Sequence, residues 1–147
     1  MTLSFDFKQA PAHLIRRAHQ LATSLFMQET AEFDVTPVQF AVLNALMETP
    51  GADQVTLAAR VALDAATSGS VISRLEAKGW IRRKPDSSDK RRKLLWVTPA
   101  GIRAVQQMLA HVKRVQDHVL SPLNAKERVQ FQTLLTKLVA GHEEEPG

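Results

Sequence analysis

The sequence contains no cysteine among its 147 residues. Disulfides, thiolate catalysis, thiol redox sensing and cysteine-ligated zinc are therefore excluded. Long apolar runs are also missing, since no stretch approaches the roughly 18 consecutive apolar residues of a membrane span. The N-terminus MTLSFDFKQ lacks the basic-then-apolar pattern of a secretory signal. We therefore expect a cytoplasmic protein with no membrane partner.

Familiar catalytic motifs are missing as well. The chain has neither G-x-S-x-G nor H-E-x-x-H, and its carboxylates are scattered over predicted helix faces. An enzyme would need a nucleophile with a base, paired carboxylates in a cleft, or a set of metal ligands. His111 and His118 share one face of a predicted helix, but two histidines are too few to hold a metal. We expect no enzymatic activity, no metal and no cofactor.

Positive charge is concentrated in one segment. Hydrophobic residues make up 44% of the chain, enough to bury one core, and the net charge is only +4. Between Arg74 and Lys93, however, nine basic residues stand against three acidic ones, so this segment carries +6 and the rest of the chain −2. A positive field focused on a short segment is typical of a surface that binds a polyanion. Charge alone leaves open the alternative of a solvated charged loop.

The first third of the sequence has the pattern of two helices. Residues 11–32 carry apolar side chains at helical spacing, which predicts a long first helix with one broad apolar face. Thr36, Pro37 and Gln39 form a helix start, with a capping threonine, proline at the first helical position and a glutamine placed to return the cap. We expect this second helix to reach about Glu48, where proline and glycine interrupt the pattern.

A helix-turn-helix is predicted next. A short helix over residues 56–62 is followed closely by a longer one over residues 65–78. Asp64 is placed to cap the longer helix, and Gly79 suits the left-handed residue that ends it.

Beyond Gly79 the pattern is that of strands. Residues 80–83 and 94–97 are short runs rich in large apolar side chains, and we expect them to pair as a hairpin around a polar loop. Thr98 and Pro99 then begin a fifth helix to about Val119, and Asn124 begins a last helix with a capping-box pattern. Residues 143–147 are expected to be a frayed tail.

The order helix, helix, helix-turn-helix, basic hairpin, helix, helix resembles that of the MarR family of ligand-responsive transcription regulators. The most specific segment is RLEAKGWIRRKPDSSDKRRKLLWVTPAG (residues 74–101), in which Asp86, Asp89 and Arg91 precede the sequence VTPAG. The resemblance runs over about residues 12–139. It implies a mainly α-helical fold with a small β-hairpin wing, in one domain over residues 1–147. A winged helix-turn-helix lobe at about 36–98 would be flanked by dimerisation helices at about 11–33 and 99–142.

The second helix of the helix-turn-helix is expected to read DNA. Such a helix enters the major groove, where hydroxyls can donate to or accept from base edges and arginine can bind guanine or phosphate. We predict DNA contacts for its exposed polar residues, which are Thr67, Ser68, Ser70, Ser73 and Arg74. The alternative is that the hydroxyl residues only keep the helix soluble.

The wing is expected to reach the minor groove. The resemblance assigns Arg91 to that groove and Asp89 to an ion pair that aims it. A narrow minor groove concentrates negative potential, which an arginine at a hairpin tip can reach. Lys90 and Arg92 are predicted to contact phosphates, which adds affinity and salt dependence but no sequence information. A solvated loop is the alternative for these two residues.

The resemblance also implies a homodimer held by the first and last helices. The last helix supplies a wide apolar surface, made of Val129, Phe131, Leu134, Leu135, Leu138 and Val139. A single chain could bury that surface alone. Two-fold symmetry would place two recognition helices in successive major grooves, roughly 34 Å apart on one face of B-DNA.

A small-molecule pocket between the dimer helices and the DNA-binding lobe is implied as well, often filled in that family by aromatic carboxylates or phenols. Arg16, Arg17 and His19 cluster on the first helix, and we predict that they and His111 bind the effector. An arginine beside an apolar pocket can hold a carboxylate through two parallel hydrogen bonds. Surface charge or an ion pair in the dimer is the alternative for both arginines.

The sequence thus predicts a ligand-responsive regulator that binds double-stranded DNA, a repressor released from a palindromic operator by a small aromatic carboxylate or phenol. The alternative is a sequence-indifferent architectural or RNA-binding protein, which would keep the basic hairpin but need neither a palindrome nor an effector. Binding to its own promoter, compared with binding to random duplex at the same salt concentration, separates the two.

Overall fold

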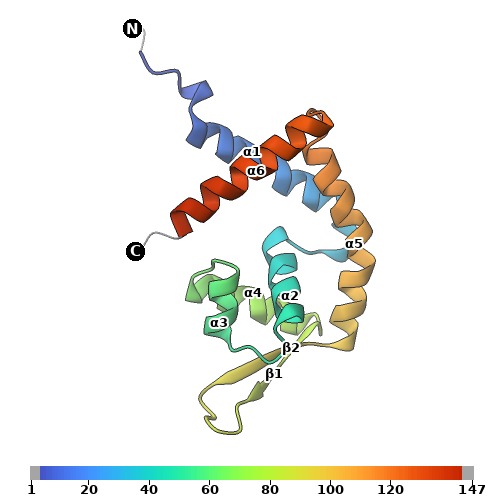
Figure 1. The fold of residues 1–147 in the computed structure, drawn as a ribbon. Coiled ribbons are helices and arrows are strands. Elements are labelled where there is room, and N and C mark those ends of the chain that lie inside the picture. Colours follow the sequence, from blue (N-terminus) through green and yellow to red (C-terminus); the bar gives the residue numbers. More distant parts are fainter. Residues whose placement is uncertain (1–3, 144–147) are drawn as a thin grey trace.

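The computed structural model describes residues 4–143, which form two ends joined by one long helix (Figure 1). Two helices lie at one end, α1 (Pro11–Glu29) and α6 (Ala125–Glu143). The other end consists of α2 (Pro37–Glu48), α3 (Gln54–Arg60), α4 (Ala65–Ala77) and a hairpin of β1 (Ile81–Pro85) and β2 (Lys93–Val97). Between them runs α5 (Pro99–Val119). The predicted architecture, mainly helical with one small β-hairpin, is confirmed.

The first helix ends earlier than expected. α1 stops at Glu29 rather than Glu32, and the hydroxyl of Thr30, the residue that follows, donates to the Phe26 carbonyl at 2.7 Å beside the last helical amide bond. A short 3-10 turn, Ala31–Phe33, follows, and Asp34 then takes a left-handed conformation with φ of 52°. A threonine hydroxyl that bonds the preceding turn competes with continued helix.

The capping box predicted for α2 is present. The Gln39 amide donates to the Thr36 hydroxyl at 3.1 Å, and the Thr36 amide donates to the Gln39 side chain at 3.2 Å. Two otherwise unpaired amides at the start of the helix are thereby satisfied. α2 then runs through the core, with Val42, Leu43 and Leu46 buried.

α3 and α4 form the predicted helix-turn-helix, with a bend of 105° between them. α3 occupies Gln54–Arg60 rather than residues 56–62, because Asp53 caps it by accepting the Thr56 amide at 2.7 Å and Ala62 leaves the helix at a φ of 55°. The cap predicted for α4 is confirmed, since Asp64 accepts the Thr67 amide at 2.7 Å. Gly79 beyond the helix has a φ of 78°, the left-handed conformation that glycine adopts at little cost.

The hairpin is one pair of antiparallel strands in which Arg83 faces Leu95. Trp80, expected to be in the first strand, instead lies in the turn that follows α4, where its amide donates to the Leu75 carbonyl at 3.0 Å. The free edge of β2 is tied to the segment before α3. The Gly51 amide donates to Leu95 at 2.8 Å, and the Leu95 amide donates to Ala52 at 2.9 Å.

The core lies between α2, α4, the hairpin and the first half of α5. Its fully buried side chains include Leu43, Leu46, Ile72, Leu75, Ile81, Leu95 and Met108. α1 packs along α5, whereas no residue of α6 within Ala125–Glu143 is buried. The predicted frayed tail lies outside the described residues, apart from Glu143, the last residue of α6. Between residues 4 and 143 no single helix has both the length and the hydropathy of a membrane span.

Candidate DNA-binding surface

The exposed face of α4 carries four of the five side chains predicted to contact DNA. Thr67, Ser70, Ser73 and Arg74 are exposed. Ser68 is not, since only 1% of its surface is accessible. Its hydroxyl donates to the Ala65 carbonyl at 3.0 Å and lies 3.4 Å from the side-chain nitrogen of Gln54. The prediction that Ser68 lies on the exposed face is therefore wrong: this hydroxyl joins α4 to α3 inside the helix-turn-helix.

Ser73 is held by the wing. A terminal nitrogen of Arg83, on β1, donates to the Ser73 hydroxyl at 3.2 Å. The Nε of the same guanidinium lies 3.3 Å from the Glu76 carboxylate, but it is buried and lacks hydrogen-bond geometry toward that oxygen, so this contact is Coulombic. Arg83 thus links α4 to the hairpin through its side chain.

The wing tip presents Arg91 to solvent. The expected ion pair with Asp89 is present, since the Arg91 Nε lies 3.2 Å from a carboxylate oxygen that also accepts the Arg91 amide at 3.1 Å. The Arg91 side chain is nevertheless 93% exposed. Lys90 beside it is exposed as well. A short acidic turn therefore orients a basic tip without covering it.

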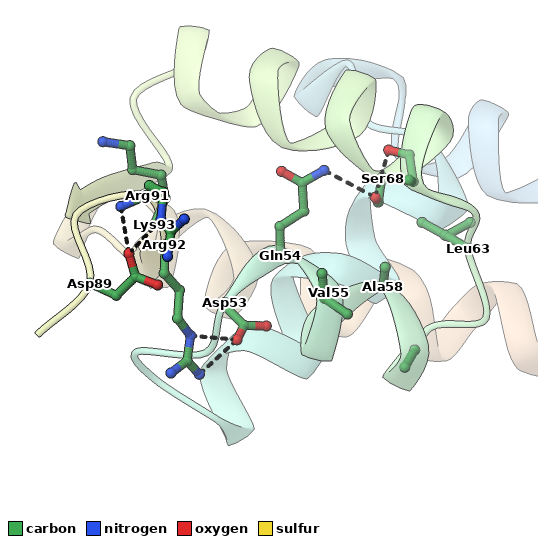
Figure 2. A pocket seen from close by; sticks show the side chains of 12 residues that line it. Asp53, Gln54, Val55, Ala58, Leu63, Ser68, Asp89, Arg91, Arg92 and Lys93 are labelled. Carbon is green, nitrogen blue, oxygen red and sulfur yellow. Dashed lines mark hydrogen bonds and ion pairs between the residues drawn. The ribbon is translucent and has the colours of Figure 1, made fainter. Parts of the chain in front are cut away.

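Arg92, which was predicted to contact phosphate, is half exposed and forms two ion pairs within the chain. Its Nε and one terminal nitrogen each lie 2.7 Å from the Asp53 carboxylate (Figure 2). Its other terminal nitrogen lies 3.5 Å from Asp86. Hydrogen bonds from Thr56 lower the pKa of Asp53 the most, and Arg92 lowers it further. The pKa of Asp86 is lowered mainly by hydrogen bonds from Ser88 and also by the charge of Arg92.

A groove of about 710 Å³ separates the helix-turn-helix from the wing (Figure 2). Its basic wall is formed by Arg91, Arg92 and Lys93 of the wing. The opposite wall is mostly aliphatic, formed by Val55, Ala58, Ala59, Leu63 and Ala65. The recognition helix and the wing tip therefore border one open channel with positive charge along one side.

The residues predicted to bind an effector do not gather in one place. Arg16 and Arg17 are exposed near the start of α1, where they contact His13 at 3.4 Å and Gln20 at 3.2 Å. His19 is exposed too. His111 contacts Glu29 at the other end of α1, roughly 20 Å away along a helix that rises 1.5 Å per residue. Within one chain, His111 therefore lies apart from Arg16, Arg17 and His19, and effector binding by these residues stays a prediction.

His111 is held in a network between α5 and the end of α1. Its Nδ1 lies 3.1 Å from Glu29 and its Nε2 3.1 Å from Glu32, while its ring meets Phe33 edge-on with centroids 5.5 Å apart. Arg114 joins the same network, with its Nε 2.7 Å from Glu29. Hydrogen bonds from Arg114, then from His111, lower the pKa of Glu29. These contacts fasten the DNA-binding end to α1.

A second groove, of about 600 Å³, lies between α1 and the turn from α5 to α6. Its lining is largely apolar and includes Ala18, Leu21 and Leu25 from α1, Val119, Leu120 and Leu123 from the turn, and Phe131 from α6. His118 is on its rim. Arg17 directly precedes Ala18 of this groove in the sequence, whereas Arg16 lies on the opposite side of α1 by the helical period.

The winged helix-turn-helix region and the whole chain both match known proteins. A family model described as "MarR family" matches residues 33–92. The HTH-type transcriptional repressor NicR of Pseudomonas putida is 30% identical over 139 residues, which cover 95% of this chain and 88% of NicR. The chain belongs to the MarR family.

Solved MarR-family structures share the fold over nearly their full length. PcaV of Streptomyces coelicolor, in complex with its natural ligand, is 35% identical with a TM-score of 0.86, covering 95% of this chain and 98% of PcaV. BpsR of Bordetella bronchiseptica, whose DNA binding is regulated by 6-hydroxynicotinic acid, is 31% identical with a TM-score of 0.86, covering 93% and 98%. The chain is thus a DNA-binding transcriptional regulator with a winged helix-turn-helix.

Sequence reasoning missed three side chains that organise this MarR-family surface. Asp53 is the N-cap of α3, where its side chain accepts the Thr56 amide. Aspartate directly before a helix is a typical N-cap signal, but the predicted helix began only at Thr56. Gln54 and Arg83 gave no comparable signal. Their partners, Ser68 and Ser73, are 14 and 10 residues away along the chain.

Proposed function

We propose that this protein is a dimeric repressor that binds a palindromic operator and leaves it when a small aromatic carboxylate or phenol binds. The DNA-binding part of this proposal rests on one observation: α4 has an exposed polar face, and the tip of the wing carries an exposed arginine oriented by an aspartate. Thr67, Ser70 and Arg74 face solvent on α4, and Arg91 is 93% exposed beside Asp89. Because α4 and the wing border one channel, α4 can bind in the major groove of DNA while the wing reaches the adjoining minor groove.

The roles of the side chains differ. Arg74 and the two hydroxyls of α4 contact base edges or phosphates in the major groove. Arg91 enters the minor groove, where negative potential is concentrated in narrow A·T-rich tracts. Lys90 contacts phosphate and adds affinity that falls with salt.

Dimerisation would cover the apolar face of α6. Leu134 is 65% exposed and Val129 is 67% exposed, although both lie on a well-formed helix. Leu14 and Ile15 on α1 are also exposed. A second copy of the chain would bury these side chains, and a two-fold axis between the copies would align the recognition helices with successive major grooves.

The groove between α1 and the α5–α6 turn is the proposed effector site. It is largely apolar, as a site for an aromatic ring should be, and it lies at the end of the chain that is proposed to dimerise. Arg17 shares a helix face with Leu21 of the groove, whereas Arg16 lies opposite by the helical period, toward a second chain. PcaV is known in complex with its natural ligand, and the DNA binding of BpsR is regulated by 6-hydroxynicotinic acid, which supports a small-molecule effector.

The effector hypothesis is tested by titrating benzoate-like and cinnamate-like acids and 6-hydroxynicotinic acid into a preformed complex with promoter DNA. We expect at least one acid to lower DNA affinity about 5- to 150-fold, the usual range of coupling between two sites. Arg16→Ala and Arg17→Ala should weaken this response without weakening DNA binding itself. No response to any acid at millimolar concentration, or a full response in both variants, would rule out this effector class or this site.

A further inference from the structure

The side chain of Arg92 connects the wing loop, residues 86–92, to the rest of the helix-turn-helix. Its guanidinium is 2.7 Å from Asp53, the residue that caps α3 (Figure 2). It is also 3.5 Å from Asp86, at the opposite end of the loop. The two carboxylates are only 17% and 13% exposed. Arg92 itself is 52% exposed, but its donors that contact these carboxylates are not free for phosphate.

The base of the wing and its tip are fixed by different interactions. At the base, backbone hydrogen bonds join Leu95 to Gly51 and Ala52. Toward the tip, the loop is closed on itself, because the Asp86 amide donates to the Arg92 carbonyl at 2.8 Å and the Arg92 amide donates to Asp89 at 3.0 Å. Apart from Arg92, no hydrogen bond or ion pair within residues 4–143 joins the loop from Asp86 to Arg92 to the remainder of the helix-turn-helix.

We propose that Arg92 is a positioning residue for DNA recognition, which fixes the wing tip against the start of α3 through Asp53 and so sets where the adjacent Arg91 meets the minor groove. The inference rests on the proposed function. It assigns Arg92 a role different from that of its neighbours: Arg91 and Lys90 contact DNA, whereas Arg92 contacts Asp53. The negative charge of Asp53, close to the DNA-binding surface, thereby favours binding indirectly.

The ion pair between Arg92 and Asp53, here called the clamp, can be removed without removing the N-cap of α3. One oxygen of its carboxylate accepts the Thr56 amide at 2.7 Å, and the other accepts from Arg92 at 2.7 Å. A serine at this position keeps an oxygen for the cap but cannot reach Arg92. Asp53→Ser therefore removes the clamp while α3 stays capped.

The two accounts of Arg92 predict opposite signs for this variant. If Arg92 contacts phosphate, Asp53→Ser removes a nearby negative charge, frees the guanidinium and tightens DNA binding. If Arg92 positions the wing, Asp53→Ser weakens DNA binding although the protein becomes more positive. Arg92→Ala should then weaken binding by a similar factor, and the double variant should be no weaker than either single variant.

The experiment measures affinity for a duplex from the DNA upstream of the protein's own gene, at several salt concentrations. Its variants are Arg92→Ala, Asp53→Ser, their combination, Lys90→Ala and, as a control cation at the far end of the chain, Lys126→Ala. We expect the first two to weaken binding about fivefold, near the upper end for a partly exposed ion pair, with the salt slope unchanged. Lys90→Ala should lower the slope by about one, and Lys126→Ala should match the wild type.

Hydrogen exchange of the wing in the DNA-free protein provides a second readout. Arg92→Ala and Asp53→Ser should both speed amide exchange in residues 86–92, whereas Lys90→Ala should not. Tighter DNA binding by Asp53→Ser, a salt slope lowered by Arg92→Ala, or unchanged exchange in both clamp variants would overturn the positioning role. A wild-type protein that binds its promoter no better than random duplex would instead contradict the proposed function, and the exchange result would still decide whether the clamp exists.

Discussion

The Nε of Arg114 lies 2.7 Å from the carboxylate of Glu29, and this ion pair joins the middle of α5 to the end of α1. The Nδ1 of His111 lies 3.1 Å from the same carboxylate. Since α5 runs directly into the wing through Thr98, the network lies on the path between the proposed effector site and the DNA-binding end. The strength of this network therefore affects the stability of the fold and the coupling between the proposed effector site and the DNA-binding end.

Glu29→Gln should lower stability at neutral pH, and the loss should disappear in acid. Hydrogen bonds from Arg114, followed by those from His111, lower the pKa of Glu29 below its ordinary value of 4.5. A carboxylate whose pKa is lower in the folded state stabilises the fold above the ordinary pKa and loses that effect as the pH falls through the folded value. Thermal unfolding of both proteins between about pH 3 and pH 7 checks this. A difference that is the same at every pH would contradict the assignment.

Gly101→Ala should destabilise the protein. Gly101 is in the first turn of α5, and a Cβ there would collide with the Trp80 carbonyl oxygen and lie 2.7 Å from the Val97 side chain. Backbone cannot move as a flexible side chain can, so we expect a cost of about 1–3 kcal/mol in the free energy of unfolding. Gly141→Ala on α6, where nothing lies within 4 Å of the added Cβ, is the control. Equal stability of the two variants in chemical denaturation would contradict the close approach.

Local signals in the sequence were enough to predict most element boundaries. Thr36, Asp64 and Thr98 each accept an amide of the helix that they were expected to cap, and Gly79 has the expected positive φ. These features depend on residues within three or four positions of one another, so they can be read without knowing the fold.

What the sequence could not predict depends on tertiary contacts. Arg92 and Asp53 are 39 residues apart, and nothing in either segment indicates that they meet. Ser68 was misplaced because a serine fits an exposed helix face as well as the interior of a helix-turn-helix, where Gln54 satisfies it. His111 was predicted to bind a ligand, but in the fold its two ring nitrogens contact Glu29 and Glu32.

Arg91→Ala and Lys90→Ala should affect DNA binding in different ways. Arg91→Ala should weaken the free energy of binding to the specific site by about 1–3 kcal/mol. It should also reduce the base preference at the positions where the wing meets the minor groove. Loss of Lys90 should weaken specific and random duplexes alike. Both residues are exposed, so neither variant should change the unfolding temperature by much. Wild-type affinity in Arg91→Ala would remove the wing tip from the interface.

Leu134→Glu should convert the dimer into monomers. Leu134 is 65% exposed in the single chain, and a carboxylate there would have to be buried unpaired in the proposed interface. Thr133→Glu introduces the same charge on the polar face of α6 and serves as the matched control. Sedimentation velocity should report a monomer for Leu134→Glu and a dimer for Thr133→Glu. If both variants sediment as the wild type does, the apolar face of α6 is not the dimer contact.

The most direct test of the account is the ratio of affinities for specific and random DNA. The protein is titrated into a duplex from its own promoter and into a scrambled duplex of equal length and composition, at the same physiological salt concentration. We expect the promoter site to be bound at least roughly a thousandfold more tightly, by two chains per site. Equal affinity for the two duplexes would contradict sequence-specific regulation and would leave the basic wing as a sequence-indifferent binder of nucleic acid.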